Sequence, residues 1–141
     1  MYRMLLRPLF HSSKRATATL ALMAALSAGA LAQSVTDEFP TAAVRFLNEE
    51  LPQMDNAVKE RDRDYFEQAM GRMIAFSGEW GFKTASNPAL ASYSMCTDAV
   101  NDFVIVGLCR LMPNGSECEP GLAPKFDANL KRCREVAASK R

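Results

Sequence analysis

Apolar residues recur every three or four positions along most of the chain from residue 33 onwards, which is the spacing of one face of an α-helix. No alternating apolar run of strand length, bounded by turn residues, interrupts this pattern. The sequence therefore predicts an all-α fold, a small bundle of four or five helices that bury their apolar faces against one another.

Two prolines divide the predicted start of this bundle. The first helix is predicted over about residues 40–50, with Pro40 at its first position, where a missing N–H costs no helical hydrogen bond. Pro52 is expected to interrupt or kink this helix, because a proline ring clashes with the preceding turn. A further segment then covers about residues 52–62, and a complete break at Pro52 gives five helices.

A clearer helix is predicted between Asp64 and about residue 80. Asp64 and Glu67 have the spacing of a capping box, and Gly78 and Gly81 end the pattern. Its apolar face consists of Phe66, Ala69, Met70, Met73, Phe76 and Trp80. We expect this face to belong to the core, although its two methionines could also bind a soft metal ion.

The last two helices are predicted on either side of a Pro-Asn-Gly turn at residues 113–115. The earlier helix follows the cap-like pair Asn87-Pro88 and stops at Pro113, and the later one starts at about Pro124. Their apolar faces comprise Tyr93, Cys96, Val100, Phe103, Val104, Gly107 and Leu111 in the earlier helix, and Phe126, Leu130, Cys133 and Ala137 in the later one. A helical hairpin therefore closes the domain.

The four cysteines predict how this hairpin is held together. A Cys96–Cys109 bond would have to cross roughly 19 Å along one helix, whereas a disulfide tolerates ~4.4–6.8 Å between Cα atoms. In an antiparallel hairpin, facing residues keep a nearly constant sum of residue numbers. The pairs 96–118 and 109–133 give sums of 214 and 242, whereas 96–133 and 109–118 give 229 and 227. We predict the bonds Cys96–Cys133 and Cys109–Cys118, a stapled hairpin.

Other uses of the cysteines fit the spacing less well. The chain has no C-x-x-C, the usual arrangement of redox-active cysteines, and the close cysteine pairs typical of a zinc site are absent. An even number of cysteines in a small exported chain is typical of a disulfide framework. We therefore assign them no metal.

The N-terminal 32 residues differ from the rest of the chain. They contain Arg and Lys but no Asp or Glu, and residues 16–32 are rich in Ala and Leu. This stretch is short for a membrane span and ends in Ala30-Leu31-Ala32, an A-x-A cleavage pattern, with cleavage after Ala30 as an overlapping choice. We predict a Sec-type signal peptide over residues 1–32 and one helical domain over residues 33–141, in the bacterial periplasm or secreted. An uncleaved N-terminal anchor is the alternative.

Charge limits the partners of the remaining domain. Four of the 17 Lys and Arg residues and none of the 16 Asp and Glu residues lie in residues 1–32, so the rest carries a net charge of about −3. This balance argues against nucleic acid and anionic lipid as partners. Cations are concentrated in residues 122–141, where a helix dipole favours them; a basic docking patch is the other interpretation.

Few residues that carry catalytic chemistry remain. The single histidine, His11, lies in the predicted signal peptide, so the domain would lack catalytic triads, His-ligated metals and histidine acid–base catalysis. Asp98 and Asp102 share a helix face and could act as a carboxylate pair, but a solvated surface is the simpler interpretation. We expect no cofactor and no enzyme activity.

One segment could be a recognition surface. Phe76, Trp80 and Phe82 surround two glycines between predicted helices, and tryptophan is favoured at the centres of protein interfaces. These rings are the candidate partner-binding residues, and the competing interpretation is that Trp80 covers the core. The hypothesis is a non-enzymatic interaction module of the cell envelope, an inhibitor, immunity protein or secretion accessory that binds another envelope or secreted protein. The alternatives are a carrier or sensor of a small apolar ligand, and a carboxylate-only enzyme.

Overall fold

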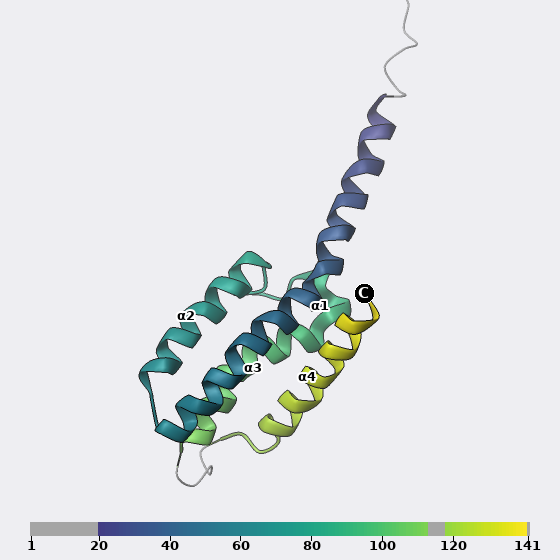
Figure 1. The fold of residues 1–141 in the computed structure, drawn as a ribbon. Helices are drawn as coiled ribbons and strands as arrows, with labels where there is room; N and C mark the ends of the chain where they lie inside the picture. Colours follow the sequence, from purple (N-terminus) through teal and green to yellow (C-terminus); the bar gives the residue numbers. More distant parts are fainter. Residues whose placement is uncertain (1–19, 113–117, 141) are drawn as a thin grey trace, which may run out of the picture. The chain divides into compact units, whose positions relative to one another are not determined.

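The computed structural model describes residues 20–112 and 118–140, with side chains from residue 36 onwards. Within these residues the secondary structure is helical and contains no strand (Figure 1). The elements in chain order are α1 (Leu20–Glu60), α2 (Asp64–Glu79), the short 3-10 helix η1 (Pro88–Tyr93), α3 (Ser94–Leu111) and α4 (Leu122–Ser139). The predicted all-α fold is confirmed, with four α-helices in the described residues.

The chain divides into two compact units. The first covers Met1–Gln33 and contains the beginning of α1, and the second covers Ser34–Arg141 and contains the packed helices. In the part of the chain that the structure describes, no helix is both long and apolar enough to cross a membrane.

Both prolines of α1 lie inside the helix, so the predicted start at Pro40 is wrong, and of the two outcomes expected at Pro52 a complete break does not occur. An interior proline costs about 3 kcal/mol because one backbone hydrogen bond is lost. Burial offsets this cost at Pro40, since the helix there buries Phe39 and Ala43 completely. Pro52 is exposed, so water can hydrate the carbonyl that its missing N–H leaves free. Because α1 continues through Pro52, the described residues contain four α-helices and not five.

The turn between α1 and α2 shows why the predicted capping box at Asp64 is wrong. Arg61 adopts a left-handed φ of 58°, and the N–H of Asp62 donates to the carbonyl of Ala57 at 2.9 Å, which ends α1 in a Schellman motif. The carboxylate of Asp62 then accepts the N–H groups of Asp64 and Tyr65 at 3.0 and 3.2 Å. Asp62 therefore satisfies two of the free N–H groups of α2, and Asp64 is the first residue of the helix.

The segment after α2 follows the sequence prediction in part. Gly81 has a left-handed φ of 71°, and the N–H of Phe82 donates to the carbonyl of Ser77 at 2.9 Å. The helix α2 therefore ends where the glycines indicate. Asn87 caps the next element by accepting the N–H of Ala89 at 3.0 Å, but this element is η1 and not the long helix. The long helix, α3, begins only at Ser94.

The end of α3 and the start of α4, on either side of the predicted turn, lie nearly as predicted. Leu111 is the last residue of α3, while the Pro-Asn-Gly turn lies outside the described residues. The last helix, α4, begins at Leu122, two residues before Pro124, after Gly121 with φ 93°. Figure 1 shows α3 and α4 side by side, and they pack directly against each other.

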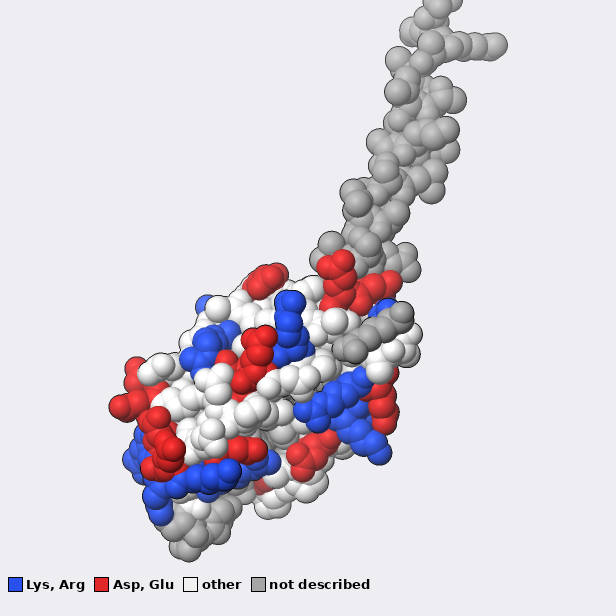
Figure 2. Space-filling view, in the orientation of Figure 1, with Lys and Arg blue, Asp and Glu red and all other residues white. Residues whose placement is uncertain are grey.

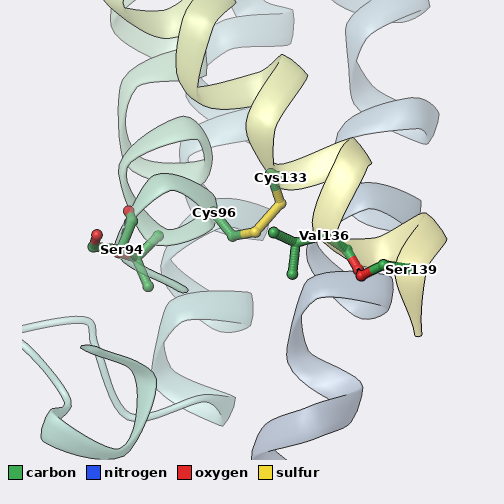
Figure 3. Close-up of a disulfide and its surroundings, with 6 residues drawn as sticks. Ser94, Cys96, Cys133, Val136 and Ser139 are labelled. Carbon is green, nitrogen blue, oxygen red and sulfur yellow. Dashed lines mark hydrogen bonds between the residues drawn. A yellow bond between two sulfur atoms is a disulfide. The ribbon is translucent and has the colours of Figure 1, made fainter. Parts of the chain in front are cut away.

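Two disulfides cross-link this hairpin as predicted. The outer disulfide, Cys96–Cys133, has Cα atoms 5.0 Å apart, and the inner disulfide, Cys109–Cys118, has Cα atoms 5.8 Å apart. Figure 3 shows the two cysteines of the outer disulfide pointing toward each other from α3 and α4. Both are fully buried, in agreement with their place on the apolar faces. Such bonds are typical of an oxidising compartment outside the cytoplasm.

The core lies among all four α-helices and η1. Its fully buried large side chains include Phe39, Leu47, Met54, Val100, Phe103, Val104, Val106 and Phe126. Gly107 of α3 lies against Met54 of α1 and Phe66 of α2, and a Cβ atom there would lie 2.8 Å from the Met54 sulfur. The close approach of α3 to α1 and α2 therefore requires glycine at this position.

Candidate functional site

An apolar hollow lies between the C-terminal half of α3 and the start of α4, beside the inner disulfide. Its volume is about 510 Å³, and its apolar wall contains Ile105, Leu108, Met112 and Leu122. We call this hollow the tip groove. A second hollow of about 400 Å³ shares Met112, Leu122 and the inner disulfide with it. The inner disulfide is therefore flanked by two depressions with apolar walls.

The side chains of the tip groove remain accessible although they are apolar. Ile105 is 50% exposed and Met112 is 41% exposed. Single exposed apolar residues are common on protein surfaces and need no explanation. Here two of them line the same depression, so the tip groove is an accessible apolar surface with a defined shape.

A second apolar face on α3 produces the tip groove. Ile105, Leu108 and Met112 follow the spacing i, i+3 and i+7, which places them on one side of the helix. Ile105 follows the buried Phe103 by two positions, about 200° around the helix, so it points away from the core. Sequence reasoning from the core-facing pattern alone missed this face. The i, i+3, i+7 spacing was the signal that could have identified it.

The end of the tip groove away from the inner disulfide is polar. The carboxylate oxygen Oδ2 of Asp102 is buried and has no hydrogen-bond donor in the described structure. The Lys125 ammonium lies 3.6 Å from this oxygen, an ion-pair distance that is too long for a hydrogen bond. Glu119 also lines the groove, so two acids and one cation surround its apolar wall.

The three aromatic candidates, Phe76, Trp80 and Phe82, come together around one core ring. The centroid of the Phe39 ring lies 5.1 Å from that of Trp80, 5.6 Å from that of Phe82 and 6.3 Å from that of Phe76. Phe82 is buried, and the other two are half-buried. Trp80 also lines a surface hollow of about 700 Å³ among charged residues. Contact with a partner through these rings is therefore limited to the exposed parts of Phe76 and Trp80.

The predicted carboxylate pair is not gathered into one hollow. Asp102 lines the tip groove, whereas Asp98, one turn earlier on α3, does not. The described residues also contain no group of three or more His, Cys, Asp or Glu side chains placed to hold a metal ion.

An ion pair between the buried Glu50 and the partly exposed Arg72 joins α1 to α2. Glu50 is only 4% exposed, and its two carboxylate oxygens accept hydrogen bonds from Arg72 at 2.5 and 2.9 Å. The Tyr65 hydroxyl donates to the same carboxylate at 2.9 Å. The pKa of Tyr65 is raised, mainly by burial and also by its hydrogen bond to Glu50. The hydrogen bonds to the Glu50 carboxylate also raise the pKa of Arg72. Every member of this cluster is satisfied within the protein, so we assign it a structural role.

Cations of residues 122–141 also contact other helices. Lys140 donates to Asp37 of α1 and, at 2.7 Å, to the Tyr93 hydroxyl, which itself donates to Asp37 at 2.8 Å. The Lys140 hydrogen bond lowers the pKa of Asp37, and Asp37 raises the pKa of Lys140. Arg134 donates to Asn48 of α1 at 2.9 Å. Figure 2 shows Lys and Arg interspersed with Asp and Glu on the visible face, an arrangement unlike a single basic patch.

The chain matches no protein-family model, no curated protein and no solved structure.

Proposed function

We propose that the chain is exported with a Sec-type signal peptide, residues 1–32, and that residues 33–141 act as a non-enzymatic protein-interaction module of the bacterial envelope. Two disulfides support export, because such bonds persist in oxidising compartments. The division between the two compact units, at Gln33 and Ser34, lies next to the predicted cleavage after Ala32 and also supports this proposal.

The single observation that carries the interaction role is the accessible apolar tip groove on a cross-linked hairpin. The inner disulfide joins the two sides of the groove, so little conformational freedom is lost when a partner binds. Protein interfaces commonly depend on a few apolar anchors placed in preformed pockets. Ile105 and Met112, both exposed before any partner binds, provide such a surface.

A carrier of a small apolar ligand is the second candidate. The volume of the tip groove, about 510 Å³, falls within the range of ligand pockets, roughly 300–1,000 Å³. The helix contacts around Gly107 are tight, however, so a ligand would bind at the surface and not between α1, α2 and α3. The exposed rim of the groove favours a protein partner.

Affinity purification from the envelope fraction tests the proposed function. The full chain, expressed at its native level with a C-terminal tag, should yield a processed form that starts at Gln33 or Leu31. It should carry both disulfides and retain one other protein in a fixed ratio. An unrelated exported domain with the same tag is the control. Retention in the cytoplasm with reduced cysteines, or the absence of a partner in a fixed ratio, would contradict the proposal.

A further inference from the structure

We propose that the inner disulfide is a thiol-exchange site, at which a dithiol oxidoreductase reduces and re-forms the Cys109–Cys118 bond while the outer disulfide stays closed. This inference goes beyond the interaction role and does not depend on it, since it uses only the two disulfides and their surroundings. Three features support it: the access to each bond, the contacts that keep the hairpin folded, and the distances that prevent the cysteines from changing partners.

The two disulfides differ in their access to an attacking thiol. Cys96 and Cys133 are both 0% exposed, and their bond lies between α3 and α4 (Figure 3). Cys109 and Cys118 are both partly exposed, and both line the tip groove and the second hollow. A thiolate must reach a sulfur atom to displace its partner, and exposed disulfides are commonly the labile ones. The inner bond is therefore the one that a thiol from outside can reach.

The outer disulfide and the core keep the hairpin folded when the inner bond is open. The outer bond joins cysteines 37 residues apart in sequence, whereas the inner bond joins cysteines 9 residues apart, so the outer bond restricts the unfolded chain more. Phe103 and Val104 of α3 belong to the same buried cluster as Phe126 of α4, which also holds the two helices together. Opening the inner bond therefore changes the end of the hairpin and leaves its fold in place.

The two freed thiols have no other partner within the folded chain. All four cysteines are in the two bonds, so no further thiol is present. Cys109 lies roughly 19 Å from Cys96 along α3. Subtracting the Cα separations of both bonds, 5.0 and 5.8 Å, leaves roughly 8 Å or more between cysteines of different bonds, beyond the ~4.4–6.8 Å that a disulfide tolerates. The open form can therefore re-form only the bond that it had.

The exchange is a two-electron transfer in two displacement steps. A thiolate of the oxidoreductase attacks one sulfur of the inner disulfide, the Cys109–Cys118 bond breaks, and the other sulfur leaves as a thiolate and takes up a proton. The second thiol of the oxidoreductase, as its thiolate, then attacks the mixed disulfide and releases the remaining cysteine, which is protonated in turn. The protein gains two thiols, and the oxidoreductase is oxidised to its own disulfide. The reverse sequence re-forms the inner bond.

Thiol trapping on the protein purified from its own cells, with both disulfides formed, tests this proposal. Reduced thioredoxin is the protein reductant, and dithiothreitol is used in a parallel series. An alkylating reagent caps free thiols at each time, intact mass counts the capped cysteines, and peptide mapping locates them. The same series in concentrated urea is the control for burial, because unfolding exposes both bonds. A Cys109→Ala/Cys118→Ala variant, checked for folding by circular dichroism, carries the outer bond alone.

The expected result with either reductant is a folded species capped at Cys109 and Cys118 and nowhere else. The outer bond, in this protein and in the variant, should open at least about a hundredfold more slowly, because only an opening of the core exposes it. This difference should disappear in urea. Simultaneous opening of both bonds, earlier opening of the outer bond, resistance of the inner bond to thioredoxin, or a difference that persists in urea would overturn the proposal.

Discussion

Replacement of Gly107 by alanine tests the packing that positions α3. A Cβ atom at this position would lie 2.8 Å from Cγ and Sδ of Met54 and even closer to a ring carbon of Phe66. Real Cβ atoms do not approach other heavy atoms so closely. Met54 is 1% exposed and Phe66 is 2% exposed, so neither side chain has open space into which it can move. The substitution must therefore push α3 away from α1 and α2 or distort these side chains.

Two opposing contributions determine the change in the free energy of unfolding. Alanine is favoured over glycine inside a helix by about 1 kcal/mol. Overpacking of a close-packed core costs roughly 1–3 kcal/mol, and we expect the upper end because both neighbours are fully buried. Gly107→Ala should therefore destabilise the domain by about 2 kcal/mol. At about 4–8 °C per kcal/mol for a domain of this size, Tm should fall by about 8–16 °C.

Gly71 in α2 provides a matched control for Gly107→Ala. A Cβ atom at Gly71 has no heavy atom within 4 Å, and the residue is exposed. Gly71→Ala should therefore gain helix stability of about 0.5–1 kcal/mol without a packing cost. Equilibrium unfolding in urea, with the disulfides intact, measures both variants. The packing argument is wrong if Gly107→Ala stabilises the protein as much as Gly71→Ala does.

Three further predictions follow from the disulfides, the Glu50–Arg72–Tyr65 cluster and the aromatic cluster. Replacing both cysteines of one disulfide by alanine should lower the free energy of unfolding by about 4 kcal/mol for the outer disulfide and by about 2.5 kcal/mol for the inner one. The outer disulfide contributes more because it closes the longer loop. A larger loss of stability in urea unfolding on removal of the inner disulfide than of the outer one would contradict this prediction. The folded state raises the pKa of Tyr65, so stability should decline as pH rises above the unfolded value of about 10, and Tyr65→Phe should reduce that decline. An equal decline in both proteins would remove Tyr65 as the cause. The fluorescence of Trp80, half-buried against Phe39, should be blue-shifted and partly protected from acrylamide, whereas the spectrum and quenching of free tryptophan would be inconsistent with the observed contact.

The cysteine pairing could be predicted from the sequence because helix geometry is nearly invariant. A rise of 1.5 Å per residue excludes a bond within one helix, and the hairpin register excludes the crossed pairing. The structure has the remaining pairing, with the outer disulfide buried between α3 and α4. The fold class could be predicted for a similar reason, since the helical spacing of apolar residues reflects which side of each helix faces the core.

The boundaries of α1 could not be predicted, because local preference and burial oppose each other there. Proline disfavours a helix interior, yet Pro40 lies fully buried between turns that carry core side chains. The start of α2 could not be predicted for a related reason: the N-cap position is Arg63, and Asp62, not Asp64, accepts the N–H groups of the first turn. Three acids, Asp62, Asp64 and Glu67, lie within six positions, and only the left-handed conformation of Arg61 brings Asp62 to the helix end.

The tip groove could be predicted only in part. The spacing of Ile105, Leu108 and Met112 is visible in the sequence, but it resembles a continuation of the core pattern until the direction of α3 is known. Oδ2 of Asp102 lacks a hydrogen-bond donor because Lys125, in another helix, lies at an ion-pair distance from it, and no sequence pattern encodes that distance. The three aromatic candidates, in contrast, stood out in the sequence because they surround glycines, and they contribute largely to the core.

Native mass spectrometry of the protein purified from its own cells tests the central proposal most directly. An interaction module predicts the mass of the processed chain, starting at Gln33 or Leu31, with both disulfides formed, together with one other protein chain in a fixed ratio. The mass of the processed chain alone, or increased only by a small molecule, would contradict the interaction role. An increase by a small molecule would support a ligand carrier.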